Sequence, residues 1–374
     1  MKRETVFLLT IVGALVLVGV LMVYSVSTVR SGEEGGAFTY DYLIAQLARV
    51  GIGIAALVAA AGFDYHHYRS RFILHTMLAG VLFLLVLVLF LAQFRNGASR
   101  WLTFYGFSMQ PSDFAKATIV ILLAVKLAEN QEHIRSFRRG FLPPMVTTLF
   151  VAFLIALERD IGTPVVIGAT ALIMVMMAGA RWLHLAVSLG PMAALVGLYV
   201  WLFPHAQERV YAWRDPMKYR SDESYQLIQS LWAFTRGGLL GLGPGAGRQK
   251  LHYLYAAESD FIFSVCGEEM GLFGTLWIVI LFALFLVVAM RIAVCAPDLM
   301  GSLMAGGIAA LIAIQAFVSM GVTTGLLPTK GLTLPFVSAG GTSLFVNLFL
   351  IGILVNIGTQ AVERDQPPKL VPAV

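Results

Sequence analysis

The 374-residue chain has few charged side chains and almost no cysteine. Asp, Glu, Lys and Arg make up 13% of it, whereas soluble domains contain about 25% of these residues. The two cysteines, Cys266 and Cys295, both lie in or beside apolar segments. Neither a disulfide framework nor a Cys/His zinc site is therefore indicated. A chain so poor in charge cannot place most of its side chains in water.

Apolar residues take the place of the missing charge. They make up 58% of the chain, and the mean hydropathy is +0.81. The net charge of +5 fits basic loops beside a membrane, and nothing indicates a nucleic-acid partner. The apolar run after residues 1–4 is too long for a cleavable signal peptide and reads as a first membrane span. The composition therefore predicts an all-α polytopic integral membrane protein.

Ten segments approach the roughly 20 apolar residues that a membrane-spanning helix needs, although the fourth and fifth are short. They are Val6–Ser25, Ile44–Phe63, Phe72–Ala92, Phe114–Leu127, Phe141–Leu157, Thr163–Gly179, Leu183–Phe203, Phe261–Met290, Leu299–Val322 and Ser343–Val362. We therefore predict about ten transmembrane helices in a single membrane domain over residues 1–374. An even number of spans places both termini on the same side.

Basic residues mark one side of this bundle. They lie at the N-terminus, in the short connections after even-numbered spans and in the tail, residues 361–374: Lys2, Arg3, His66, His67, Arg69, Arg71, His133, Arg135, Arg138, Arg139, Arg181, Arg291, Arg364 and Lys369. Because short cytoplasmic loops carry excess Lys and Arg, this side and both termini are predicted to be cytoplasmic.

One connection on the opposite, extracytoplasmic side is far longer than the usual 2–8 residues. It covers residues 204–260, between the seventh and eighth spans, and has a helical pattern over Tyr225–Phe234. The glycine-rich stretch Gly237–Gly247 follows no strand, so turn geometry explains it better than a phosphate cradle does. Arg248 and Lys250 beside it leave an anionic ligand open. Such a long loop predicts a functional role.

Asp260 lies where this polar loop meets the apolar run Phe261–Val265. Removing a carboxylate from water is costly, so a carboxylate at this position is expected to have a charged or hydrogen-bonding partner or a functional role. A carboxylate there could act as a general base toward a sugar hydroxyl. Asp is also a favoured helix N-cap. Both interpretations stay open at this point.

A second group of charges opens the fourth span. Asp113 and Lys116, at positions i and i+3, share one helix face and can form an internal ion pair. They can equally form a polar floor where Lys116 meets an anionic head group. Arg100 could lie above it, although an Arg-Trp pair is also ordinary at a membrane boundary.

The remaining candidates favour structural roles. Glu268 and Glu269 would be expensive inside a span, so at least one is predicted to pair with a cation. Asp160 belongs to a tight charged turn. The proline- and glycine-rich run Gly325–Pro335 cannot continue a helix and predicts a re-entrant or capping loop, with Lys330 available to a ligand.

Seven of these stretches, in this order, resemble the SEDS family of peptidoglycan glycosyltransferases, the FtsW/RodA/SpoVE group. The resemblance covers nearly the whole chain. It rests on Gly97-Ala98-Ser99-Arg100-Trp101, Gln110-Pro111-Ser112-Asp113-Phe114-Ala115-Lys116, Asp160-Ile161-Gly162-Thr163, Tyr225-Gln226, Ser259-Asp260-Phe261-Ile262-Phe263, Gly267-Glu268-Glu269-Met270-Gly271 and Gly325–Pro335 with Gly340-Gly341. The stretch Lys330–Pro335 is more similar to the FtsW branch.

The resemblance implies ten spans and a bacterial inner-membrane enzyme that polymerises lipid II with inversion and releases undecaprenyl diphosphate. Asp260 falls on the family's catalytic aspartate, and Arg100, Asp113 and Lys116 fall on its cavity residues. Lys330 or Arg248 would add positive charge for the diphosphate. A divalent cation, Mg²⁺ or Mn²⁺, is expected at most at the diphosphate, since the sequence has no dedicated ligand cluster. The expected partners are a class B penicillin-binding transpeptidase and other division proteins.

The chain departs from the family pattern at several positions. The family usually has Glu at Asp113, Pro at Arg159, Pro-Glu at Tyr255-Ala256, Tyr at Ala339 and a basic residue at Ala45, for which Arg49 is a substitute one turn along. Two other functions remain open: a lipid II flippase, which broken helices and intramembrane ions would suit, and an inactive scaffold that recruits a transpeptidase, which these departures favour.

Overall fold

The computed structural model describes residues 2–33, 38–91, 100–104, 107–158, 160–219, 224–250, 254 and 257–361. The departures at Arg159 and Tyr255-Ala256, and the tail after Ala361, lie outside the described residues. The described part is almost entirely helical, as the composition predicts. Strands β1 (Leu102–Phe104) and β2 (Phe107–Met109) form one short antiparallel hairpin in which Leu102 pairs with Met109.

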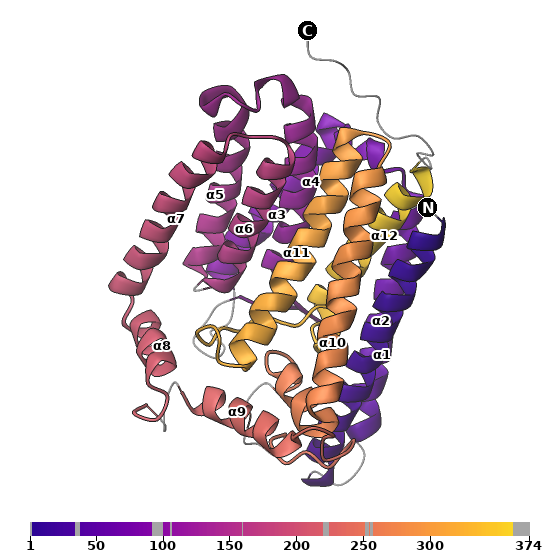
Figure 1. Cartoon of the computed structure of the whole chain (residues 1–374), viewed down its shortest axis with the longest axis vertical. Coiled ribbons are helices and arrows are strands. Elements are labelled where there is room, and N and C mark those ends of the chain that lie inside the picture. Colours follow the sequence, from indigo (N-terminus) through magenta and orange to yellow (C-terminus); the bar gives the residue numbers. More distant parts are fainter. Residues whose placement is uncertain are drawn as a thin grey trace.

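The long helices run side by side along the long axis of the molecule, and two shorter helices, α8 and α9, lie at one end (Figure 1). The helices are α1 (Lys2–Glu33), α2 (Phe38–Gly62), α3 (Arg71–Leu91), α4 (Pro111–Glu129), α5 (Leu142–Leu157), α6 (Gly162–Met177), α7 (Trp182–Leu202), α8 (Pro204–Arg214), α9 (Tyr225–Gly237), α10 (Ile262–Cys295), α11 (Leu299–Thr323) and α12 (Gly341–Gln360). The helix expected over Tyr225–Phe234 is α9.

Seven helical segments of the described chain are long and apolar enough to cross a membrane. They are Arg3–Val26, Leu43–Gly62, Arg71–Leu91, Phe137–Leu157, Ile262–Cys295, Leu299–Thr323 and Gly341–Gln360. Helix α4 carries the charged residues Asp113, Lys116 and Lys126, and α6 has only 16 residues. The chain is therefore a multi-pass membrane protein. Seven segments of this length and composition lie among the described residues, and the full number of ten spans stays a prediction.

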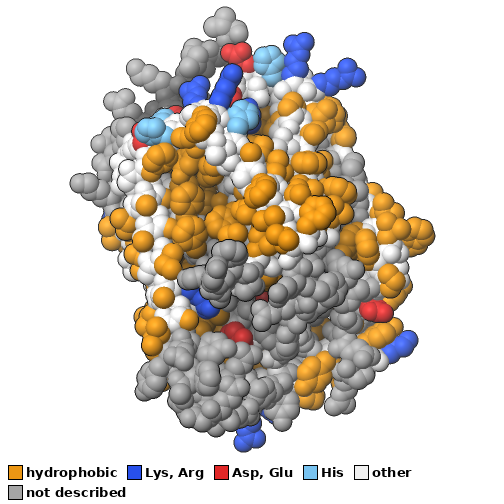
Figure 2. Space-filling view, turned by 180° about the vertical axis from the view of Figure 1, so that it is seen from behind, with side chains coloured by type: hydrophobic (Ala, Val, Ile, Leu, Met, Phe, Trp, Pro, Cys, Tyr) orange, Lys and Arg blue, Asp and Glu red, His pale blue; other side chains and the backbone are white. Residues whose placement is uncertain are grey.

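Helices α4, α11 and α12 form the centre of the bundle. In α11 and α12, 72% and 78% of the apolar span is buried inside the protein, against 17% for α2. In α4, residues on every side of the helix are buried. A helix that is buried on all sides lies in the interior of the bundle rather than at its outer surface. The face seen in Figure 2 presents a broad hydrophobic band, with Lys, Arg and His side chains gathered above it at one end.

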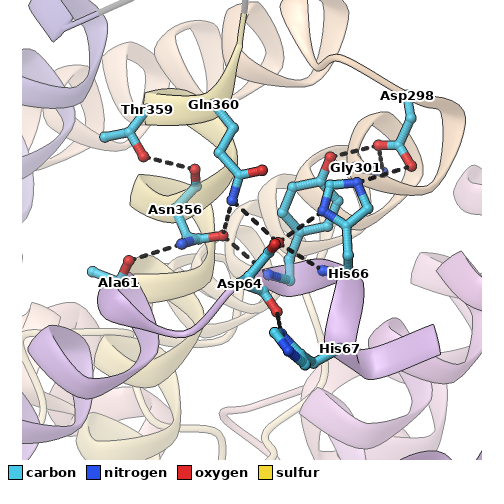
Figure 3. Close-up of polar contacts among 10 residues, drawn as sticks. Ala61, Asp64, His66, His67, Asp298, Gly301, Asn356, Thr359 and Gln360 are labelled. Carbon is cyan, nitrogen blue, oxygen red and sulfur yellow. Dashed lines mark hydrogen bonds and ion pairs between the residues drawn. The ribbon is translucent and has the colours of Figure 1, made fainter. Parts of the chain in front are cut away.

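A polar cluster joins three segments of the chain at this basic end (Figure 3). The Asp64 side chain accepts a hydrogen bond from the His66 backbone (3.0 Å), which lowers the pKa of Asp64 to about 2. The Tyr65 hydroxyl donates to Asp298 (2.6 Å), and the Tyr65 backbone N–H donates to Asn356 (3.1 Å). The α2–α3 connection, the start of α11 and the end of α12 are thereby held together.

Helix α10 is interrupted near the opposite end, which we call the loop end. Gly271 has a φ of 67° and a ψ of −165°, a conformation that favours glycine. In an unbroken helix the N–H groups of Leu272 and Phe273 would donate to the carbonyls of Glu268 and Glu269. The break leaves all four of these groups in need of other partners.

Residues 237–250, which we call the strap, supply those partners. The Leu272 N–H donates to the Gly238 carbonyl (2.9 Å), and the Leu242 N–H donates to the Glu268 carbonyl (3.0 Å). The strap bonds Phe273 and Glu269 in the same way. A Cβ at Gly241 would clash with the Glu269 carbonyl, so the close approach requires glycine there. The strap thus completes the backbone hydrogen bonding of a broken helix.

Candidate active site

Asp260 lies at the loop end, against the segment that joins α11 to α12. A Cβ added to Gly331 would lie 2.6 Å from Asp260 Oδ2, so the carboxylate sits directly on this glycine. The N-cap residue of α10 is Phe261, and no side chain caps the helix, so the N-cap interpretation of Asp260 is wrong. Burial raises the pKa of Asp260 to about 6, while the charge of Arg100 and a hydrogen bond with the Ser259 side chain oppose this rise.

Arg100 and Asp160 form an ion pair beside Asp260, with Arg100 Nη1 3.8 Å from Asp160 Oδ1. Asp160 also accepts hydrogen bonds from the backbone N–H groups of Gly162 (3.0 Å) and Thr163 (3.3 Å), and from the Thr163 hydroxyl (2.8 Å). Asp160 therefore fixes the start of α6 and the guanidinium of Arg100 at the same time.

Glu158, two residues before Asp160, is a buried acid that the sequence alone does not single out. Its side chain is 1% exposed, and within the described chain neither carboxyl oxygen has a hydrogen-bond partner. Burial and the negative charge of Asp160 raise the pKa of Glu158 to about 9, although Arg100 opposes this shift. Near pH 7, Glu158 is therefore a neutral carboxylic acid beside the Arg100–Asp160 pair.

The neutral state of Glu158 predicts a pH-dependent effect of Glu158→Gln. Wild-type stability falls between the unfolded-state pKa, near 4.5, and about 9, because only the unfolded chain releases this proton. Gln has no such proton. We expect the variant to melt at a higher temperature than wild type, by about 2–4 °C for each kcal/mol gained in the free energy of unfolding. This difference in melting temperature should widen from pH 5 to pH 9. Melting curves of both proteins in detergent test this, and a gap independent of pH would contradict it.

Lys330 brings positive charge to the same site. Burial lowers the pKa of Lys330 to about 8, the charge of Asp160 opposes this shift, and the charges of Arg209 and Arg100 add to it. Arg209 belongs to α8, whose Trp213 donates a hydrogen bond to the Gly325 carbonyl (2.9 Å). The long loop thus places a cation near Lys330 that sequence reasoning missed.

Asp113 and Lys116 lie deeper, in a buried chain of contacts. Lys116 Nζ is 2.7 Å from Asp113 Oδ1 and donates to Gln315 Oε1 at 2.9 Å. Gln315 Nε2 in turn donates to the Thr333 carbonyl at 3.0 Å. The pair therefore supports the segment that carries Lys330 through Gln315, a residue in the middle of α11 that sequence reasoning missed. A direct contact of Lys116 with substrate stays a prediction.

Glu268 and Glu269 hold the strap through their side chains. Glu268 accepts hydrogen bonds from the backbone N–H groups of Arg248 (2.9 Å) and Gln249 (3.0 Å). Glu269 pairs with Lys250 Nζ at 2.6 Å, and both of these side chains are fully buried. The Arg248 side chain is exposed on the strap. Its role toward a substrate stays a prediction.

Ser25 of α1 completes the buried pair. Its hydroxyl donates to Glu269 at 2.7 Å and accepts from Lys250 Nζ at 2.8 Å. The Lys250 ammonium also donates to the Ser25 carbonyl at 3.1 Å. One desolvated cluster, which we call the clasp, thus joins the strap and α10 to α1, which lies more than 200 positions earlier in the sequence.

The site combines a carboxylate of raised pKa with Arg100 and Lys330. A carboxylate whose pKa lies just below neutral pH is ionised there and basic enough to accept a proton from a hydroxyl. Neighbouring cations stabilise negative charge that develops on a leaving group. Among the described residues, no group of three or more His, Cys, Asp or Glu side chains is placed to hold a metal ion.

Comparisons with known proteins agree with this chemistry. The chain is 37% identical over 361 residues to the probable peptidoglycan glycosyltransferase FtsW of Geobacter metallireducens, covering 96% of each chain. It is 40% identical over 361 residues to stage V sporulation protein E of Bacillus subtilis, covering 95% of this chain and 97% of that one.

Two solved structures have the same fold. One comes from a study of the structural coordination of polymerization and crosslinking by a peptidoglycan synthase complex, with a TM-score of 0.78, 27% identity and coverage of 94% of this chain and 96% of that chain. The other, the Thermus thermophilus rod shape determining protein RodA, has a TM-score of 0.68 at 24% identity, with coverage of 95% and 96%. A family model described as "Cell cycle protein" matches residues 5–363. The chain therefore belongs to the FtsW/RodA/SpoVE family, which confirms the resemblance seen in its motifs.

Proposed function

We propose that the protein is a peptidoglycan glycosyltransferase that polymerises lipid II into glycan strands. The observation that carries this proposal is Asp260, a carboxylate of raised pKa held against Gly331, with the cations Arg100 and Lys330 within electrostatic reach of the same site. The names of its relatives, probable peptidoglycan glycosyltransferases over nearly the full length, support it. The similar proteins include FtsW proteins as well as a sporulation protein. A role in cell division is therefore a separate, more specific part of this proposal.

In the proposed reaction, Asp260 removes the proton from the 4-hydroxyl of the acceptor sugar. The resulting oxygen nucleophile attacks the anomeric carbon of the donor, and the bond from that carbon to the diphosphate oxygen breaks with inversion. The electron pair of the broken bond stays on undecaprenyl diphosphate. Arg100 and Lys330 stabilise its charge. Asp260 then returns its proton to water.

We further propose that α1–α7 and α10–α12 all cross the inner membrane, so that ten helices span it. The basic end, with both termini, then faces the cytoplasm. Residues 204–260, with α8 and α9, form the extracytoplasmic loop, and the site opens on the side where lipid II is polymerised. A class B penicillin-binding transpeptidase is the partner expected there, in keeping with the peptidoglycan synthase complex of the similar structure. A divalent cation at the diphosphate stays a prediction.

A polymerisation assay tests the function directly. The purified protein in detergent or vesicles is given fluorescently labelled lipid II, alone and with a cognate transpeptidase, and the products are separated on a gel. We expect a ladder of glycan polymer. If no polymer forms under either condition while labelled lipid II moves across vesicle membranes, the protein is a flippase. If neither reaction occurs, the scaffold interpretation replaces the enzyme.

The pKa values of Asp260 and Lys330 predict a bell-shaped pH profile for kcat/KM. Activity should rise through about pH 6, as Asp260 becomes able to accept a proton, and fall above about pH 8, as Lys330 loses its charge. Lys330→Arg keeps its charge at all these pH values. We expect this variant to shift the upper limb to higher pH and leave the lower one in place. If the upper limbs of the wild-type and variant profiles coincide, a group other than Lys330 causes the loss of activity at high pH.

A further inference from the structure

The strap exposes three leucines although it belongs to a polar loop. Leu239, Leu240 and Leu242 are 62%, 81% and 46% exposed. Their backbone is nonetheless fixed, because the Phe273 N–H donates to the Leu239 carbonyl (3.3 Å) and the Leu242 N–H donates to the Glu268 carbonyl (3.0 Å). The leucines are therefore held outward by the fold itself. Three neighbouring apolar side chains held outward in this way are typical of a surface that meets a membrane or a protein.

The depth of the strap follows from α10. Arg291, at the basic end, lies about 20 residues from the break at Gly271, which at about 1.5 Å per residue gives about 30 Å. This length matches the hydrocarbon core of a bilayer, also about 30 Å thick. The break, and the strap bonded to it, therefore lie at the boundary of the hydrocarbon core on the loop-end side.

The exposed apolar surface of α10 continues into the strap. Phe273 and Trp277, just beyond the break, are 62% and 54% exposed on a helix that has the length and composition of a membrane span. Leu239 is hydrogen-bonded directly to Phe273. On α9, which packs against α10 at this end (Figure 1), Trp232 is 41% exposed, and Trp is a typical interfacial residue. The medium in contact with the Phe273 side chain, lipid or water, is therefore also in contact with the leucines.

We propose that the strap is a membrane anchor whose leucines insert among the lipid acyl chains of the leaflet at the loop end. The anchor sets the depth of the strap and, through Lys250 and Glu269, of the chain that leads into Asp260 about ten residues later. It would keep the carboxylate at a constant height relative to lipid head groups. The proposal holds whichever reaction the site performs, because it rests on the membrane geometry of α10 alone.

Spin labelling in vesicles tests this anchor. Leu240→Cys is made in a chain with Cys295→Ser, while the buried Cys266 stays in place, and a nitroxide is attached. The protein alone is reconstituted in vesicles of phosphatidylethanolamine and phosphatidylglycerol. Collision rates are then measured with oxygen, which concentrates in acyl chains, and with a water-soluble nickel chelate. Met217→Cys is the matched control, since Met217 is 70% exposed in the same loop, between Asp215 and Lys218.

We expect the ratio of oxygen to nickel collision rates to be several-fold higher at position 240 than at position 217. A label at Leu239→Cys should give the same result, which guards against a local distortion caused by one substitution. If the label at position 240 meets the nickel chelate as readily as the label at position 217 does, the strap faces water and the proposal is wrong. The leucines would then be an uncovered surface for a protein partner.

Discussion

Asp260→Asn is expected to lower the rate of glycan polymerisation by about 10²–10⁴-fold, the usual contribution of a general base. Asparagine has nearly the same shape as aspartate and can still lie against Gly331, but it cannot take a proton from the acceptor hydroxyl. The substitution therefore removes the proposed chemical step with little effect on packing. The measurement is the initial rate of polymer formation from labelled lipid II.

The matched control for this variant is Asp215→Asn, which removes an exposed carboxylate from the same long loop. Its rate should equal that of wild type. The melting temperature of Asp260→Asn should be at least that of wild type, because a carboxylate whose pKa is raised by burial gains nothing from its charge in the fold. Polymerisation by Asp260→Asn at the wild-type rate would show that another group accepts the proton.

Lys250→Met is expected to destabilise the protein by about 3–5 kcal/mol, the usual cost of removing one partner of a buried ion pair. Among the described residues, the fully buried Glu269 carboxylate would keep only Ser25 and the Gly245 backbone N–H as donors. Met fills nearly the same volume as Lys, so the loss comes from the unpaired charge rather than from a cavity. The measurement is unfolding of the full-length protein in detergent.

The double variant Lys250→Met with Glu269→Gln separates charge from packing. It leaves no isolated charge, and Gln can still accept the hydrogen bond from Gly245, so most of the lost stability should return. Lys218→Met, at an exposed position of the same loop, should change stability by about 0.5 kcal/mol or less. If the double variant is as unstable as Lys250→Met alone, the ion pair is not what holds the strap.

Contacts that are local in sequence could be predicted from it. Apolar runs of spanning length give the membrane class, and the amphipathic pattern after Tyr225 gives α9. The spacing of Asp113 and Lys116 gives their ion pair, since residues i and i+3 share a helix face. The length of residues 204–260 marks the loop that leads to Asp260. Each of these predictions depends only on residues within one stretch of chain.

Contacts between distant segments could not be predicted. No feature of the sequence after Gly267 indicates that Glu269 contacts Ser25, which lies 244 positions away. A Gln in the middle of an apolar helix gives no sign that Gln315 links Lys116 to Thr333. Within the described chain the buried Glu158 carboxyl group has no hydrogen-bond partner, which its own stretch of sequence does not indicate. Residue types at these positions carry the chemistry, but only packing decides which of them meet.

The clasp also constrains the order in which the chain can be assembled. During synthesis Ser25 emerges first, Lys250 much later, and Glu269 last of the three. Until Glu269 arrives, the Lys250 ammonium has no carboxylate to pair with, and the strap has no helix break to bond. The long loop can therefore reach its final form only after α10 has been made and inserted, so completion of the site is coupled to the eighth of the ten proposed membrane crossings.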